Sequence, residues 1–223
     1  MGEENSRINE KRVKIFQSEL LRWYKHNARS FPWREPGCSS YEILIAELLL
    51  QKTKAENIVI TYNSFIKKFP DFITLLQSNE EELSKLLQPL GLYRNRAKSL
   101  LMLAEDIEEI GIIPMEPEIL LKLPGMGPYI AYSYLVFAHN KRFPIVDTNI
   151  RRLYQRVFSI DSKPDPRRDH NIWIVVESTM PRRNYRKFLY AILDHSALVC
   201  KSRNPLCIEC PLSKICDYYL KSC

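Results

Sequence analysis

The sequence of 223 residues has no run of 18 apolar residues, so a membrane-spanning helix is not expected. Its first residues, MGEENSRINEKRVKIF, are charged and lack the apolar segment of a secretory signal peptide. These two absences predict a cytoplasmic protein, whose six cysteines are not by default paired in disulfides. Patterns typical of strands are nearly absent, as are internal repeats and low-complexity tracts.

The composition provides a core and an excess of positive charge. Hydrophobic residues make up 45% of the chain, enough for one large domain or two small ones with a packed interior. The net charge of +7 and the pI of about 9.0 suit a polyanionic partner such as nucleic acid. Charge alone leaves this partner open, because many basic proteins bind nothing acidic.

Apolar residues recur at intervals of three and four, and this spacing predicts an all-α fold of many short helices. Ser40 is the expected cap of one helix, and Gly111 is the expected stop of another. Residues 170–180 contain a β-branched run typical of a strand, but no partner strand lies nearby, so we predict a helix. The predicted helices cover residues 9–27, 41–69 in two pieces joined near 54, 69–77, 79–88, 93–111, 128–139, 146–158, 170–180 and 182–200.

The segment LPGMGPYIAY, residues 123–132, crowds two glycines and two prolines in front of good helix formers. Such a cluster predicts a tight turn between two helices. Gly125 and Gly127 permit backbone angles that other residues avoid, and their bare amides at a helix N-terminus suit an anion.

Four cysteines follow the spacing C-x6-C-x2-C-x5-C, namely Cys200, Cys207, Cys210 and Cys216. Four thiolates hold either a 4Fe-4S cluster or a structural zinc ion. Zinc favours two C-x2-C pairs, and only one is present, so the spacing favours iron–sulfur; two disulfides are the third possibility. Cys38 and Cys223 fall outside this spacing and are expected to be ordinary thiols.

Basic residues surround the four cysteines. Lys201 and Arg203 lie between the first two, and further cations precede them at Arg182, Arg183, Arg186 and Lys187. Such side chains either contact phosphates or form an ordinary solvated face.

Several segments in order resemble one family. FPWR, YEILIAELLLQKT, LGLYRNRAKSL, LPGMGPYIA and VDTNIRRL, followed by the cysteine spacing, are similar to helix-hairpin-helix DNA glycosylases of the endonuclease III and adenine glycosylase branch. The resemblance spans about residues 30–216. Each motif alone is weak, but their order and spacing together are specific.

The resemblance implies two domains with DNA bound between them. A six-helix barrel domain with the helix-hairpin-helix covers residues 30–138, and a cluster domain combines residues 1–29 and 139–223. The amides of Gly125 and Gly127 are expected to hold a DNA backbone phosphate, and Lys201 and Arg203 are expected to bind DNA.

The resemblance also assigns catalytic residues. Asp147 matches the aspartate that stabilises the cation-like sugar while the N-glycosidic bond breaks, and Asn149 is expected to hydrogen-bond near it. From the residues alone, an N-terminal helix cap is the commoner role for such an aspartate. Glu47, inside an apolar run, matches a glutamate that protonates the departing base, because a buried carboxyl tends to have a raised pKa; an exposed helix face is its other possible place.

Tyr129 lies 18 residues before Asp147, where the bifunctional branch carries a lysine that attacks the sugar and cuts the strand. A phenol forms no Schiff base, so the sequence predicts a monofunctional DNA N-glycosylase without strong lyase activity; Tyr129 packs on the sugar or in the core. Gln51 and Leu92 match residues that fill the base stack after a base flips out; Leu92 is otherwise a loop residue tucked into the core.

Two substrates fit the resemblance. Adenine glycosylases usually carry an additional C-terminal domain, whereas small mismatch-specific thymine/uracil glycosylases stop just past the cluster, as this chain does. We therefore expect a monomeric, nucleoid-associated enzyme of base excision repair that removes T or U opposite G in double-stranded DNA. Excision of A opposite G or 8-oxoguanine is the alternative, and a non-catalytic, cluster-bearing DNA-binding protein is the second.

Overall fold

The computed structural model describes residues 8–165 and 169–222. All regular elements within these ranges are helices, which confirms the all-α prediction. The chain divides into two compact units. The central unit runs from Ser30 to Lys141, and the terminal unit combines the described residues up to Arg29 with those from Arg142 onward.

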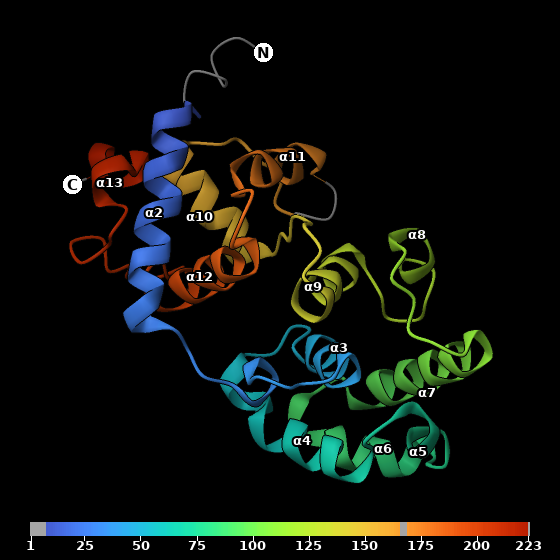
Figure 1. The fold of residues 1–223 in the computed structure, drawn as a ribbon. Coiled ribbons are helices and arrows are strands. Elements are labelled where there is room, and N and C mark those ends of the chain that lie inside the picture. Colours follow the sequence, from blue (N-terminus) through green and yellow to red (C-terminus); the bar gives the residue numbers. More distant parts are fainter. Residues whose placement is uncertain (1–7, 166–168, 223) are drawn as a thin grey trace. The chain divides into compact units, whose positions relative to one another are not determined.

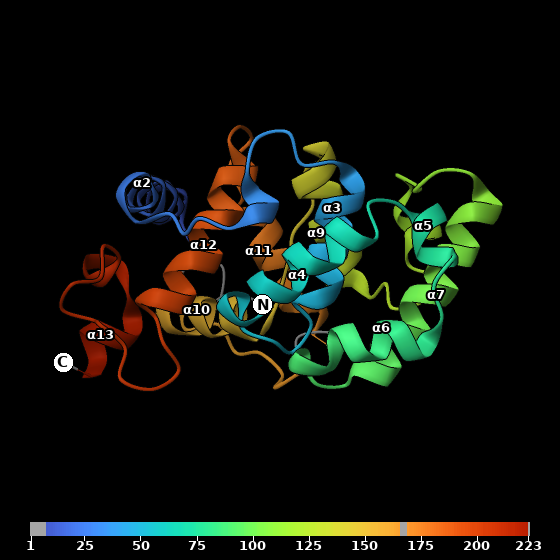
Figure 2. The ribbon, with the colours of Figure 1, turned by 90° about the horizontal axis from the view of Figure 1, so that it is seen from below.

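The central unit is built around α3, a helix whose residues are almost all buried. α3 packs against α9 and α4 (Figure 2). The capping residue of α3 is Ser39 and not Ser40 as expected, because Ser39 has the extended backbone of a cap and exchanges hydrogen bonds with Glu42. The elements of this unit are η1 (Pro32–Arg34), α3 (Ser40–Leu49), α4 (Ala55–Lys68), α5 (Phe72–Leu76), α6 (Glu80–Leu87), η2 (Gln88–Leu90), α7 (Tyr93–Ile110), α8 (Pro117–Leu120) and α9 (Pro128–His139).

The longest helix of the central unit, α7, packs against α5 and α6 (Figure 1). It buries a stripe that includes Leu100, Leu103 and Ile107. Gly111 ends α7 with φ of +85°, as predicted, because a left-handed residue stops a helix with little strain only where no Cβ is present.

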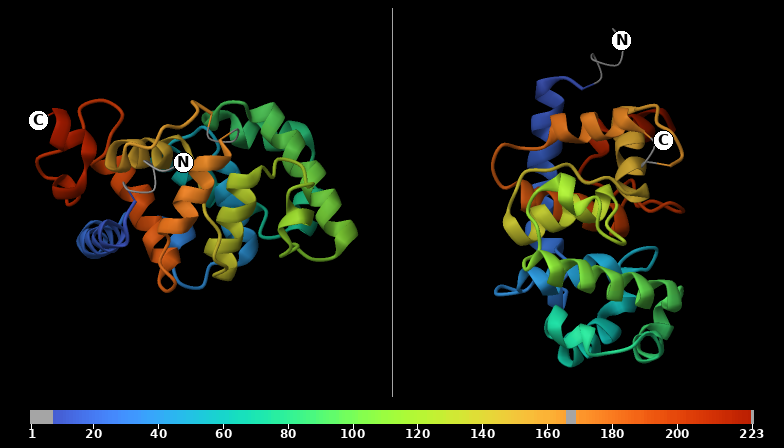
Figure 3. Two further views of the ribbon diagram at one scale, coloured as in Figure 1. Left: turned by 90° about the horizontal axis from the view of Figure 1, so that it is seen from above. Right: turned by 90° about the vertical axis from the view of Figure 1, so that its right-hand side faces the viewer.

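The terminal unit brings the two ends of the sequence together. Its helices are α2 (Glu10–Asn27), α10 (Thr148–Phe158), α11 (His170–Thr179) and α12 (Tyr185–Leu198), followed by η4 (Ser213–Ile215) and α13 (Asp217–Ser222). α2, drawn in blue, packs against α12, and α10 packs against α12 and α13 (Figures 1 and 3). Phe16 of α2 meets the rings of Tyr154, Phe158 and Phe188 edge-on, with centroids 5.0 to 5.8 Å apart.

A buried ion pair ties the end of this N-terminal segment to α12. The carboxylate of Asp194 is fully buried and accepts hydrogen bonds from Nε of Arg29 at 2.7 Å and from its backbone amide at 2.9 Å. α11 is a helix as predicted, despite its β-branched residues. Within the described ranges, no helix combines the length and apolar character needed to cross a membrane.

Candidate active site and cysteine cavity

The turn between α8 and α9 uses only one of its two glycines for an unusual backbone angle. Gly125 has φ of +76°, whereas Gly127 has φ of −78° and ψ of 171°, an ordinary extended conformation. The expectation of special angles at both glycines is therefore wrong for Gly127. Gly127 instead caps α9, Pro128 takes the first position of that helix, and both glycines are exposed. An exposed helix N-terminus without a capping side chain suits an anion.

Asp147 caps α10 in the terminal unit. Its Oδ1 accepts hydrogen bonds from the backbone amides of Asn149 at 2.9 Å and Ile150 at 2.7 Å. Its Oδ2 accepts a third from Nδ2 of Asn149 at 2.8 Å, so the expected contact between these two side chains is present. Asp147 is half-buried. The carboxylate is therefore held in one orientation by its own helix.

Arg152, one turn further along α10, extends this arrangement toward the cysteines. Its Nη1 donates to Oδ1 of Asn149, and its Nε donates to the carbonyl oxygen of Cys200, both at 2.9 Å. Its Nη2 donates to the carbonyl oxygen of Ser196 at 2.9 Å. A continuous chain of hydrogen bonds thus runs from Asp147 through Asn149 and Arg152 to the backbone of the first cysteine.

Glu47 and Tyr129 lie in the central unit, on two helices that pack against each other. Glu47 lies in the last turn of α3 and is 5% exposed, so the exposed-face alternative is wrong. Tyr129 is the second residue of α9 and is half-buried, not a fully enclosed core aromatic. A buried carboxyl beside apolar groups favours its neutral form, which is the form that can donate a proton.

Gln51 and Leu92 lie in exposed turns of the central unit. Leu92 is 58% exposed with φ of +52°, so it is not tucked into the core. Gln51 lies just past the end of α3 and donates from Nε2 to the carbonyl oxygen of Gly125 at 3.0 Å. Arg96 joins the two turns, because its guanidinium donates to the carbonyl oxygens of both Gln51 and Gly91. Gln51 and Leu92, which are predicted to enter the base stack, therefore lie on two turns that Arg96 links by hydrogen bonds.

Four cysteines line one cavity of the terminal unit, together with residues of α10 and α12. Cys200 and Cys216 are buried, while the other two are half-buried, and no disulfide joins any two of the four. Among the described side chains, no three of the Cys, His, Asp or Glu type converge as closely as a single metal ion requires. The four are Cys200, Cys207, Cys210 and Cys216. Cys38 lies elsewhere and donates to the carbonyl oxygen of Pro32, and Cys223 is outside the described residues.

Polar groups approach these sulfur atoms from two helices. Nη1 of Arg156 lies 3.5 Å from Sγ of Cys200, and Nε2 of His195 lies 3.3 Å from Sγ of Cys210. Burial, together with the neighbouring cysteines, raises the pKa of the Cys210 thiol to about 12. Burial likewise raises the pKa of Cys216 and lowers the pKa of His195 to about 4. Thiols in such a cavity stay protonated unless a cationic centre favours their ionised form.

Comparison with known proteins identifies the family of the chain. Residues 45–173 match the family described as HhH-GPD superfamily base excision DNA repair protein. A thymine-DNA glycosylase of Aeropyrum pernix is 35% identical over 218 residues, which are 95% of this chain and 97% of that protein. The chain belongs to the HhH-GPD superfamily of DNA glycosylases. The resemblance drawn from the five segments is thereby confirmed.

Other members of the HhH-GPD superfamily are similar over most of the chain. The solved structure of a thermostable thymine-DNA glycosylase superposes with a TM-score of 0.85 at 32% identity, covering 95% of this chain and 98% of that one. An adenine DNA glycosylase of Mycobacterium tuberculosis is 34% identical over 206 residues, which are 89% of this chain but 66% of that protein. The helix-hairpin-helix glycosylase fold expected from the sequence is the fold of the chain.

Four residues of this HhH-GPD protein were not singled out in the sequence. Arg152 follows Asn149 by three positions, so helical spacing alone places both on one face of α10. His195 lies one to two turns before Cys200 on a predicted helix, a weaker signal. Arg96 occurs within a recognised motif, but no pattern indicates which carbonyls it binds. Arg12, whose contacts are described below, carries no sequence signal at all.

Proposed function

We propose that this glycosylase removes thymine or uracil mispaired with guanine from double-stranded DNA and leaves an abasic site. In this reaction the bond between C1′ of the sugar and the base nitrogen breaks, water adds its oxygen to C1′, and a proton reaches the leaving base. The chemistry needs a negative charge near the sugar and a proton donor near the base.

The single observation that carries the proposal is the restrained carboxylate of Asp147. Two backbone amides and one side-chain amide hold it, so its orientation is set before substrate arrives. A preorganised charge stabilises a developing cation without reorganising in the transition state. Asp147 is therefore assigned to the cation-like sugar.

The proton donor is Glu47, whose burial in α3 favours its neutral form. Tyr129 on the neighbouring α9 is assigned to the sugar or the flipped base. A tyrosine at this place provides no amine for a Schiff base, so the enzyme is expected to release the base without cutting the strand.

Two findings favour thymine and uracil over adenine. The thymine-DNA glycosylase of Aeropyrum pernix is 35% identical to this chain. The solved thermostable thymine-DNA glycosylase superposes on it with a TM-score of 0.85 at 32% identity. Uracil is thymine without one methyl group, and a pocket that fits the larger base seldom rejects the smaller one strongly. Adenine excision is the second candidate, because the identity to the mycobacterial adenine glycosylase is almost the same.

We further propose that the four cysteines hold a 4Fe-4S cluster. A structural zinc ion favours two C-x2-C pairs, and the spacing of the four cysteines contains one. A cubane cluster is wider and takes one thiolate at each of its four irons. Four thiols around one cavity, without disulfides and with the cationic Arg156 beside Cys200, suit its negative charge. When bound, the cluster would shape the loop that carries Lys201 and Arg203, both exposed.

The enzyme is proposed to act as a monomer, since both candidate carboxyl groups and the hairpin belong to one chain. Its place in the cell is with chromosomal DNA, where its substrate is. Lys201, Arg203 and the amides of the hairpin are assigned to phosphates, so binding should weaken steeply with salt.

Labelled duplexes test the activity. Duplexes that contain G·T, G·U, A·G, A·8-oxoguanine or G·C are incubated with the protein, and each is analysed with and without hot alkali. Cleavage of G·T and G·U only after alkali is expected. Cleavage of the A-containing duplexes alone would support the second candidate, cleavage before alkali would contradict the monofunctional assignment, and binding without cleavage of any duplex would favour a non-catalytic protein.

A further inference from the structure

The last cysteine, Cys216, stands on elements too short to fix its position by themselves. It lies between η4, which has three residues, and α13, which has six. Its amide donates to the carbonyl oxygen of Ser213, and its own carbonyl oxygen accepts from the amide of Leu220. Isolated helical segments of this length are not stable in water, because too few hydrogen bonds offset the cost of nucleation. A tertiary contact must therefore hold Cys216.

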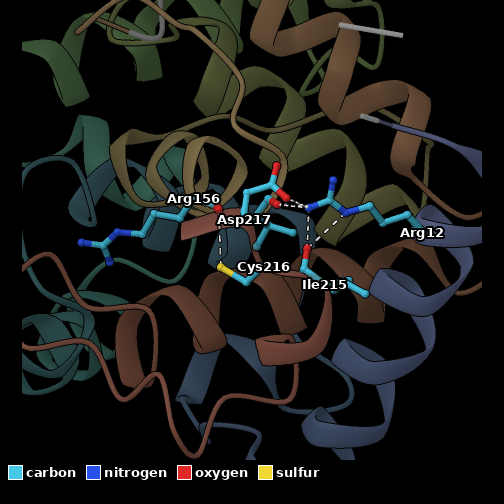
Figure 4. Close-up of polar contacts among 6 residues, drawn as sticks. Arg12, Arg156, Ile215, Cys216 and Asp217 are labelled. Carbon is cyan, nitrogen blue, oxygen red and sulfur yellow. Dashed lines mark hydrogen bonds and ion pairs between the residues drawn. The ribbon is translucent and has the colours of Figure 1, made fainter. Parts of the chain in front are cut away.

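Arg12 of α2 makes that contact on both sides of Cys216 (Figure 4). Its Nη2 pairs with Oδ1 of Asp217 at 2.6 Å, and its Nε donates to the carbonyl oxygen of Ile215 at 3.1 Å. The residues immediately before and after the cysteine are thus bound by one guanidinium. The side chains of Arg12 and Asp217 are only 16% and 19% exposed, so water competes little for this pair.

The same guanidinium reaches the C-terminal end of α10. Its Nη2 donates to the carbonyl oxygen of Val157, and its Cζ lies 5.2 Å from the centre of the Phe158 ring. The neighbouring carbonyl, that of Arg156, accepts a hydrogen bond from Sγ of Cys216 at 3.4 Å. Carbonyls in the last turn of a helix have no partners within that helix, and a cation is favourable there. Arg12 and Cys216 therefore satisfy adjacent groups of one helix end.

We infer that Arg12 is a positioning residue for Cys216: it couples the N-terminal helix to the fourth thiol of the cysteine cavity and so determines how firmly that thiol holds an iron–sulfur cluster. The inference rests on the proposed cluster. Its basis is the Arg12 contacts to Ile215 and Asp217, which lie in the chain on either side of the ligand. Residues that orient metal ligands typically change metal retention about ten- to a hundredfold when replaced.

The test measures cluster retention in the full-length protein, purified without air. Wild type, Arg12→Lys, Arg12→Gln and Asp217→Asn are compared for iron and sulfide per chain, visible absorbance near 400 nm, and the rate of absorbance loss in a ferrous chelator. Arg22→Gln is the matched control, because Arg22 lies on the same helix, is largely exposed and pairs with Glu19 on that helix. The melting temperature of each protein after removal of iron reports global stability separately.

Arg12→Gln and Asp217→Asn are expected to lose the cluster about ten- to a hundredfold faster than wild type, and Arg12→Lys to fall between because an ammonium cannot bind both sides at once. Arg22→Gln should match wild type. Equal rates for wild type, Arg12→Gln and Asp217→Asn overturn the inference while leaving the cluster in place. A wild type without iron and sulfide overturns both the inference and the proposed cofactor, and activity on mismatched duplexes is read independently of either.

Discussion

Arg152 binds the carbonyl oxygen of Cys200 through Nε at 2.9 Å. Because another nitrogen of the same guanidinium binds Asn149, which in turn binds Asp147, the candidate catalytic carboxylate and the cysteine cavity share one hydrogen-bonded path. A planar guanidinium with five donors can link such groups rigidly, whereas a lysine cannot. The backbone at Cys200 is thus positioned to influence the orientation of Asp147 through this path.

The hydrogen-bonded path from Asp147 to Cys200 predicts that Arg152→Gln slows base excision. Loss of its contacts to Asn149 and two carbonyls should let Asp147 leave its productive orientation, and small displacements of catalytic groups cost about a hundredfold in rate. We expect single-turnover excision from a G·U duplex to fall about ten- to a hundredfold. Arg151→Gln is the neighbouring control, since Arg151 binds the carbonyl oxygen of Lys163 instead. Equal excision rates for the two variants would show that the path is not used.

Asp147→Asn separates the proposed catalytic role of this residue from its role as a helix cap. Asparagine caps helices about as well as aspartate, so the free energy of unfolding should change by less than about 0.5 kcal/mol. Removal of the charge should lower the excision rate by about a hundredfold or more while duplex binding persists. Asp147→Ala should lose both activity and about 1 kcal/mol of stability. Full activity of Asp147→Asn would leave Asp147 as a helix cap only.

Glu47→Gln tests the proton donor. Glutamine has nearly the same shape and fits the buried site in α3 without a charge, so the protein should fold with its stability largely kept. Excision should fall by about 10² to 10⁴, the usual contribution of a general acid. Glu105→Gln, on the exposed face of α7, serves as the control. Rates are followed by denaturing electrophoresis after alkali, and a variant as fast as wild type would remove Glu47 from the mechanism.

The two hairpin glycines give a matched pair. Gly125→Ala should lower the free energy of unfolding by about 1–2 kcal/mol, because φ of +76° strains any residue with a Cβ. Gly127→Ala should be nearly neutral: its backbone is extended, an added Cβ meets no atom within 4 Å, and a poorer cap is offset by a less flexible unfolded chain.

Affinity for duplex DNA then shows whether a hairpin substitution affects DNA binding separately from its effect on stability. If a phosphate approaches the amides, Gly127→Ala should weaken binding without unfolding, uniformly across sequences. Denaturant unfolding and fluorescence anisotropy at one fixed salt concentration make the comparison. Unchanged affinity in Gly127→Ala would place the phosphate elsewhere.

Much of this protein follows from local sequence. The period of apolar residues predicted the helices, Gly111 and the hairpin glycines marked real turns, and four cysteines at a fixed spacing line one cavity. These features depend on neighbours within a few positions, where spacing alone sets geometry. Ser39 took the cap expected of Ser40 because two adjacent serines offer the same side chain, and only the backbone distinguishes them.

Contacts between residues far apart in the sequence could not be predicted in this way. Arg12 and Asp217 are 205 positions apart, and Arg29 and Asp194 are 165 apart, yet each pair forms an ion pair that is largely shielded from water. Thirty-three Lys and Arg residues and twenty-six Asp and Glu residues offer many equivalent pairings in a sequence. The tertiary structure decides which of these charges pair. Only the packing of α2 onto α12 and beside α10 brings these particular charges together at places that are shielded from water.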